Sequence, residues 1–198
     1  MKVTKIVKTK NPKYPRKVML SDGTILKVPQ QKKWNSFCQK HGCSIVAVQI
    51  ALQHLGVDLN PNEVYEWCKK HITGYTGSKL TVYGTMLAIN NISKSSAAKW
   101  YPVTGSDKNK KAAINRIREC LKAGGIVLFE QRSPIHTNVI VGFRKGGVYN
   151  ATNGVVKKTT VKALYNIALH GYSSASKQRK WFRGSKYGAG YVTVIPDR

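Results

Sequence analysis

The stretch HGCSIVAVQIALQHLG, residues 41–56, sets the architecture of this chain. Four of its apolar residues repeat at the i, i+3, i+7, i+10 spacing of one helix face: Ile45, Val48, Leu52 and Leu55. Apolar neighbours at 46, 47, 50 and 51 widen that face, and Gly56 provides a C-cap. The pattern predicts a largely buried helix over residues 44–55, with Cys43 immediately before it.

Further elements are predicted on both sides of this helix. Residues 17–28 have the pattern of a hairpin, because two β-rich runs flank Asp22-Gly23. Asn60 and Glu63 predict the capped start of a second helix. The other expected elements are helices over 83–91, 107–122 and 160–169, and strands over 97–103, 126–131, 136–143, 147–151 and 191–196.

Helices first and antiparallel strands afterwards predict an α+β domain. At 198 residues, against roughly 150 for an average domain, the chain favours one domain over 18–198 after a loosely held basic arm, residues 1–17. With 41% hydrophobic residues and 7 Pro it can bury a core, which excludes collagen-like and disordered classes. We find neither an apolar run long enough for a membrane span nor the apolar core of a signal peptide. The compartment stays open: cytoplasmic, or secreted with the signal removed.

The net charge is strongly positive, because 34 Lys and Arg against 8 Asp and Glu give +26. Such an excess attracts nucleic acid, anionic lipid, acidic cell-wall polymers or acidic substrates. The loop 173–188 interleaves cations with aromatic rings, which suits a phosphate backbone with stacked bases or an anionic glycan. A solvated surface kept soluble by lysines is the alternative interpretation.

Four cysteines stand at 38, 43, 68 and 120, without a CxxC pair. Zinc sites use paired close spacings, so we expect no structural metal, and no motif indicates a cofactor. In an oxidising compartment Cys38 and Cys68 can bridge, whereas a reducing one keeps four thiols.

Cys43 is the candidate nucleophile. At the start of a helix, the positive end of the dipole stabilises a thiolate, and the free first amides can donate to an oxyanion. Gly42 allows a tight turn that leaves the sulfur accessible. The alternative interpretation of Cys43 is a small buried hydrophobe.

His136 is the candidate general base, because it begins the apolar strand HTNVIVGF, residues 136–143. A base must sit on a rigid element and still reach the proton of the nucleophile, and a strand end meets both needs. The other four histidines lie in a loop or at predicted helices: His41, His54, His71 and His170. A structural histidine at a sheet edge is the alternative.

An orienting partner for the ring is expected from the next strand. Residues 136–166 contain no Asp or Glu, which leaves Asn150 and Asn153, whose amide oxygens can hold the ring as in Cys-His-Asn systems. A turn centred after residue 145 sets His136 opposite Val155, with Asn153 on the diagonal. A tighter turn would favour Asn150.

Four stretches in this order resemble the peptidase C39-like family, the bacteriocin-leader peptidases and their relatives among papain-like cysteine peptidases. They are HGCSIVAVQIALQHLG (41–56), KAGGIVLFEQ (122–131), HTNVIVGFRKGG (136–147) and VYNATNG (148–154). The resemblance runs over residues 28–195. It departs from the family pattern at Ser44-Ile45, where the family has Gly-Pro, and at Asn153-Gly154, where the family has Asp-Pro.

The resemblance implies a papain-like fold, with an N-terminal helical part packed on a C-terminal antiparallel sheet. It also implies hydrolysis of amide bonds in a peptide or protein substrate, through a thioester on Cys43 and with His136 as base. Asn153 then orients the ring. Gln31, in the stretch VPQQ at 28–31, becomes the oxyanion donor, with Gln39 as the alternative donor.

Two other functions are consistent with these residues. The same thioester can pass its acyl group to an amine, which would make the protein an acyltransferase. A catalytically silent basic domain on the same scaffold would instead hold nucleic acid or an anionic cell-wall polymer by charge.

Overall fold

The computed structural model describes residues 1–73, 75, 77, 80–103, 107–132, 135–170 and 190–197. Its strands form two antiparallel sheets. The smaller sheet has the order β1-β2-β3, with β1 Val3–Lys8, β2 Arg16–Leu20 and β3 Ile25–Val28. The larger sheet has the order β4-β9-β5-β6-β7-β8, with β4 Ala98–Pro102, β9 Gly190–Val194, β5 Ile126–Arg132, β6 Ile135–Arg144, β7 Gly147–Thr152 and β8 Val155–Thr159.

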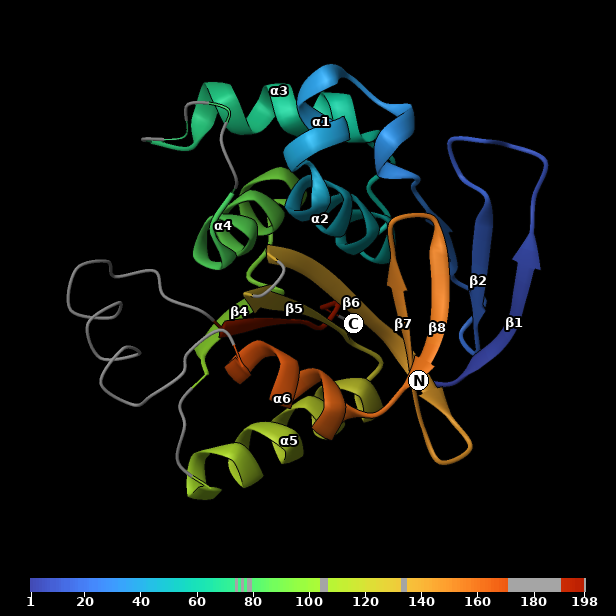
Figure 1. Ribbon diagram of the computed structural model, residues 1–198, viewed down its shortest axis with the longest axis vertical. Helices are drawn as coiled ribbons and strands as arrows, with labels where there is room; N and C mark the ends of the chain where they lie inside the picture. The colour runs from blue at the N-terminus through green and yellow to red at the C-terminus, as the bar shows by residue number, and fades with distance from the viewer. Residues whose placement is uncertain are drawn as a thin grey trace.

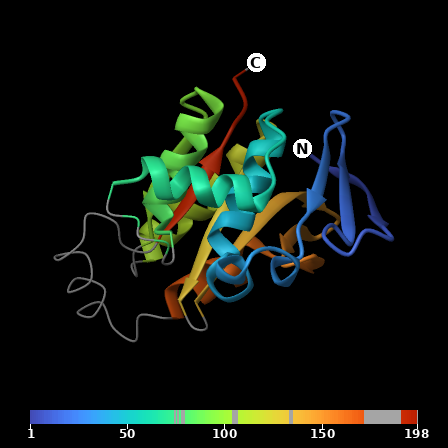
Figure 2. The same cartoon turned by 90° about the horizontal axis from the view of Figure 1, so that it is seen from above.

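Helices lie on both sides of the larger sheet (Figure 1). On one side are α1 Ser36–His41, α2 Cys43–His54, α3 Pro61–His71 and α4 Val82–Ser93; on the other are α5 Asp107–Lys122 and α6 Val161–His170. Each side has its own core: Leu128 and Val139 of the sheet pack toward α2, and Phe129 and Ile140 pack toward α5 and α6. Figure 2 shows the smaller sheet at one side, away from α4. The α+β class is the predicted one.

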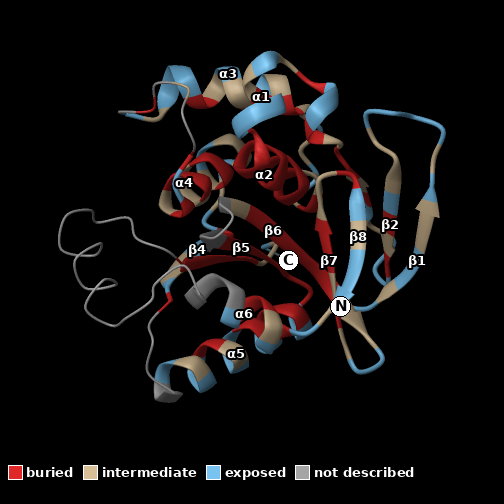
Figure 3. Ribbon diagram, viewed as in Figure 1, coloured by how far each residue is buried: buried red, intermediate tan, exposed pale blue. Residues whose placement is uncertain are grey.

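Helix α2 runs through the centre of the first layer. Eleven of its twelve residues are buried (Figure 3). It begins at Cys43, one residue before the predicted start, and Gly56 follows its end with a φ of 80°. The prediction of a largely buried helix is confirmed, because β3, β6, α3 and α4 surround it.

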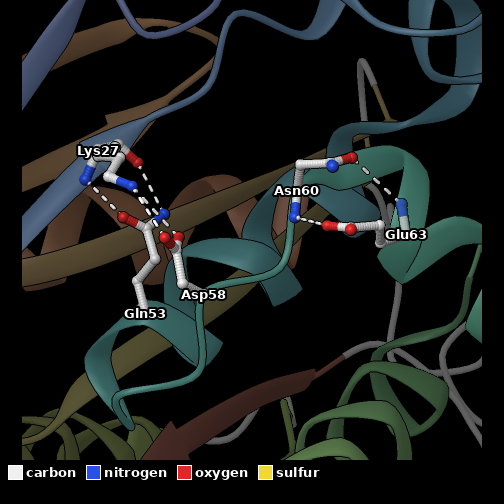
Figure 4. A network of polar contacts seen from close by, with 5 residues as sticks. All are labelled: Lys27, Gln53, Asp58, Asn60 and Glu63. Atoms are coloured by element: carbon white, nitrogen blue, oxygen red, sulfur yellow. Dashed lines mark hydrogen bonds and ion pairs between the residues drawn. The ribbon is translucent and has the colours of Figure 1, made fainter.

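The start of α3 has the predicted capping box. Asn60 Oδ1 accepts from the Glu63 backbone N–H at 3.2 Å, and Glu63 Oε2 accepts from the Asn60 N–H at 2.6 Å (Figure 4). In the same region, the backbone N–H and C=O of Lys27 pair with the Gln53 side-chain amide at 2.7 and 3.0 Å. Lys27 Nζ also lies 3.2 Å from the Asp58 carboxylate. These contacts tie β3 to the C-terminal end of α2.

The prediction of a loosely held arm over 1–17 is wrong for its first half, because residues 3–8 form β1 and pair with β2. The backbone also joins the larger sheet, since the Phe143 N–H donates to the Met1 carbonyl at 3.0 Å. Exposed positions of this strand carry Lys5 and Lys8, so its basic composition concealed the strand pattern. Pairing with β1 covers an edge of β2 that would otherwise be open.

The remaining expected elements are confirmed, with ends that shift by a few residues. Strand β8 was not predicted, and the loop 173–188 lies outside the described residues. Within the described part of the chain, no helix combines the length and apolar character needed to cross a membrane.

Candidate active site

Cys43 is the first residue of α2, and Gly42 is its N-cap. The Gly42 N–H donates to the Cys38 carbonyl at 3.1 Å, so α1 ends directly in front of α2. A Cβ at Gly42 would lie 2.5 Å from Cys38 Cα and 2.7 Å from the Cys38 carbonyl oxygen. Only glycine therefore fits this turn. Cys43 is 9% exposed and lies at the helix end whose first amides have no partner within the helix.

The Cys43 thiol contacts Thr137 near the start of β6. Its Sγ atom lies 3.8 Å from Thr137 Oγ1, and Thr137 is buried. Thr137 pairs directly with Glu130 of β5, a carboxylate that is only 3% exposed. A thiol, a hydroxyl and a buried carboxylate therefore share the α2 face of the sheet.

His136 lies on the opposite face of the sheet. Side chains alternate along a strand, and on β6 Val139 packs toward α2 whereas Ile140 packs toward α6. His136, four residues before Ile140, therefore points to the α6 side, where its Nε2 is hydrogen-bonded to Thr152 Oγ1. The expected contact between His136 and Cys43 is not made in the part of the chain that the structure describes.

A β-bulge in β6 explains this change of face. The register with β7 shifts by one residue between Ile140 and Gly142. Phe143 and Ile140 both pack in the core on the α6 side, although residues three apart on a regular strand face opposite sides. On a strand without the bulge, His136 would face the α2 side, where Cys43 lies.

The bulge also changes which residues oppose each other. Val139 pairs with Ala151, and the same register continued by two residues sets Asn153 across from Thr137. The predicted pairing of His136 with residue 155 is therefore wrong by one position. A shift of one residue exchanges the two faces of a strand, which is why the error matters for the site.

Gln31 and Asn153 are in direct contact. Asn153 lies in the turn between β7 and β8 with a φ of 48°, and its Oδ1 accepts from the Gln31 backbone N–H at 3.1 Å. Gln31 begins the short 3-10 helix η1 (Gln31–Lys33), and its Nε2 donates to the Gln39 carbonyl of α1 at 3.3 Å. Gln31 therefore lies beside α1, the helix that leads into Cys43, and Gln39, the alternative donor, is part of that helix.

Asn150, the alternative orienting residue, lies on the same face as His136. Its Nδ2 donates to Asn138 Oδ1 at 2.8 Å. The hydrogen bond that the structure gives the His136 ring is with Thr152 instead of with either asparagine.

Thr137 and Glu130 are the site residues that sequence reasoning missed. For Glu130 a signal was present, because it is the single carboxylate inside the apolar strand IVLFEQ, residues 126–131. Thr137 directly follows the predicted base, and only the bulge decides which of these two neighbours faces the thiol.

The other three cysteines are poorly suited to nucleophilic chemistry. All four cysteines are free thiols. Burial raises the pKa of Cys38 to about 11 and the pKa values of Cys68 and Cys120 to about 12. These three are at most 3% exposed, so Cys43 is the most accessible thiol of the chain.

Comparison with known proteins agrees with the resemblance drawn from the residues. A model of the Peptidase C39 like family matches residues 25–179. A crystal structure of a protein from Bacillus anthracis, assigned to the C39-like peptidases, has a similar fold with a TM-score of 0.50 at 12% identity. That match covers 80% of this chain and 90% of the other. The comparison with curated proteins found no match.

Proposed function

This chain belongs to the peptidase C39-like family, and on that premise we propose that it is a cysteine peptidase with Cys43 as its nucleophile. One observation carries the proposal: Cys43 begins a buried helix and its sulfur lies against the start of β6. Since the other thiols are buried and hard to ionise, Cys43 is the one suited to attack a carbonyl.

In the proposed reaction, His136 takes the Cys43 proton and sulfur attacks the substrate carbonyl, which forms a C–S bond. The oxyanion accepts hydrogen bonds from the Cys43 backbone N–H and the Gln31 side chain. The imidazolium then protonates the leaving amine as the C–N bond breaks. Water hydrolyses the thioester to a carboxylic acid and restores the thiol. Asn153 orients the ring.

This chemistry requires His136 to take the place that Thr137 occupies. The segment that must turn is short, because it runs only from the start of β6 at residue 135 to the bulge after Ile140. With the bulge at the beginning of β6, side chains alternate regularly along the rest of the strand, and the His136 ring turns to the α2 face. His136 thereby exchanges its bond with Thr152 for the Cys43 thiol.

Hydrolysis of a fluorescently labelled unfolded protein by the full chain tests this function. Cys43→Ala and His136→Ala are expected to abolish cleavage, and Gln31→Ala to lower the rate by about 10²–10³. Cys120→Ala serves as the matched control and keeps full activity. Cleavage that survives Cys43→Ala contradicts the assignment. Product analysis with and without an added amine separates a hydrolase from an acyltransferase, because the thioester serves both.

A binding function is the second candidate. It is favoured by the Thr137 hydroxyl, which touches the thiol where a peptidase needs an imidazole, and by the +26 charge. Retention on heparin or DNA should then fall steeply between about 50 and 200 mM salt and be unchanged by Cys43→Ala. Retention that does not depend on salt contradicts binding by charge.

A further inference from the structure

A hollow of about 430 Å³ lies on the α6 side of the larger sheet, across the sheet from Cys43. Three neighbouring strands line it, and Leu164 of α6 closes one side. The strand residues that carry its chemistry are His136, Asn138, Asn150, Thr152 and Lys157. A volume of a few hundred Å³ is the size of a small-molecule site.

One hydrogen-bond acceptor in this hollow lacks a partner. Asn150 is 7% exposed, and its Nδ2 is used by Asn138. Its Oδ1 is buried without a hydrogen bond to any described residue. Buried polar atoms are nearly always paired, so a ligand O–H or N–H that reaches the Asn150 amide would supply the hydrogen bond that this oxygen lacks.

Lys157 supplies a cation next to that acceptor. In the β7–β8 register Lys157 is the direct partner of Asn150, and both residues line the hollow. The described residues that line the hollow include no Asp or Glu. A ligand that uses both groups therefore carries an anionic group and a hydroxyl.

We propose that this hollow binds a small hydroxylated anion, a sugar or polyol that carries a phosphate or a carboxylate. Asn138, Asn150 and Thr152 offer the mixed donors and acceptors that ring hydroxyls need, because each hydroxyl both donates and accepts. A nucleotide fits less well, since no Phe, Tyr or Trp is among the described lining residues to stack on a base. The hollow shares His136 with the proposed peptidase chemistry, but it lies across the sheet from the Cys43 thiol.

Isothermal titration calorimetry on the full chain tests the site with four probes: glucose 6-phosphate, glucuronate, glucose and inorganic phosphate. We expect glucose 6-phosphate or glucuronate to bind at least about tenfold more tightly than glucose or phosphate alone. The phosphate and carboxylate probes distinguish the two anionic groups. Cys43→Ala leaves the affinity unchanged, so a failed peptidase assay and a failed binding assay are separate results.

Two variants connect the binding to the hollow. Lys157→Gln removes the cation from an exposed strand position and should weaken binding about tenfold, while Lys17→Gln, at an exposed position of β2, leaves it unchanged. Asn150→Asp keeps the shape and places a negative charge beside the ligand, which should also weaken binding. Equal affinity for glucose and glucose 6-phosphate, equal loss in Lys17→Gln, or no measurable binding of any probe would overturn the proposal.

Discussion

Cys43 Sγ and Thr137 Oγ1 lie 3.8 Å apart where α2 meets the start of β6. A threonine hydroxyl can share a hydrogen bond with a thiol, but it does not take the thiol proton at neutral pH as an imidazole can. The imidazole of the preceding residue, His136, is on the other face of the sheet and bonded to Thr152. The residue of β6 that contacts the thiol is thus Thr137, and the imidazole that a Cys–His pair would need belongs to the residue directly before it.

Alkylation should distinguish the four thiols. At neutral pH, iodoacetamide is expected to modify Cys43 in the folded protein at least about tenfold faster than the other cysteines, because thiols with pKa values of about 11 and about 12 hold almost no thiolate there. Peptide mapping by mass spectrometry gives the four rates. In urea all four should react alike, and comparable rates in the folded protein would contradict the prediction.

Exchanging the two neighbours on β6 tests the role of the bulge. In the double variant His136→Thr with Thr137→His, the imidazole enters on the face that already contacts Cys43, so no change of strand phase is needed. We expect Cys43 to be alkylated about tenfold or more faster than in the natural chain, as for a thiol paired with a base. Slower alkylation than in the natural chain would mean that an imidazole at 137 does not reach the sulfur.

The parts of the molecule that the sequence predicted are encoded locally. Helix α2 follows from apolar spacing, and the start of α3 follows from Asn60 and Glu63, whose side chains bond to backbone only a few residues away. Gly42 and Cys43 were placed correctly at the start of α2, because a helix boundary depends on neighbouring residues.

The face of the sheet toward which His136 points was not predictable in the same way, because it depends on contacts between β6 and the N-terminal end of the chain. At the bulge Gly142 has a φ of 153°, and a Cβ there would lie 3.1 Å from Val3 Cγ2 and 3.3 Å from the Met1 carbonyl oxygen. The N-terminal strand therefore packs against the point where β6 changes phase. Nothing within residues 136–143 signals that contact.

Gly42→Ala should destabilise the protein and disturb the nucleophile. The new methyl group would meet Cys38 backbone atoms at 2.5 and 2.7 Å, and overpacking of this kind typically costs about 1–3 kcal/mol. Urea denaturation measures the loss, and the alkylation rate of Cys43 reports the displaced sulfur. Gly56→Ala is the control, because its Cβ would meet nothing within 4 Å and only its φ of 80° is strained. Gly56→Ala should therefore leave the Cys43 alkylation rate unchanged, and an unchanged rate in Gly42→Ala would contradict a role for Gly42 in placing the thiol.

Folding stability should fall in mild acid because of His54. Burial lowers the pKa of His54 below its ordinary 6.5. The hydrogen bond to the Gly124 carbonyl and the charge of Asp22 both raise this pKa, but the effect of burial is larger. His54 Nε2 donates to the Gly124 carbonyl at 2.9 Å, and Nδ1 is buried without a hydrogen bond to any described residue, so a second proton there would be unpaired.

As the pH drops below the unfolded value of 6.5, the unfolded chain binds a proton that folded His54 resists. The free energy of unfolding therefore decreases toward acid, by up to about 1.4 kcal/mol per pH unit from this residue. Urea denaturation between about pH 5 and about pH 8 measures the slope. His54→Gln keeps a donor for the Gly124 carbonyl and should remove the part of this pH dependence that comes from His54. His71→Gln changes an exposed histidine at the end of α3 and leaves the buried His54 ring in place, so it should keep the slope. An equal loss of slope in both variants would assign the pH dependence to groups other than His54.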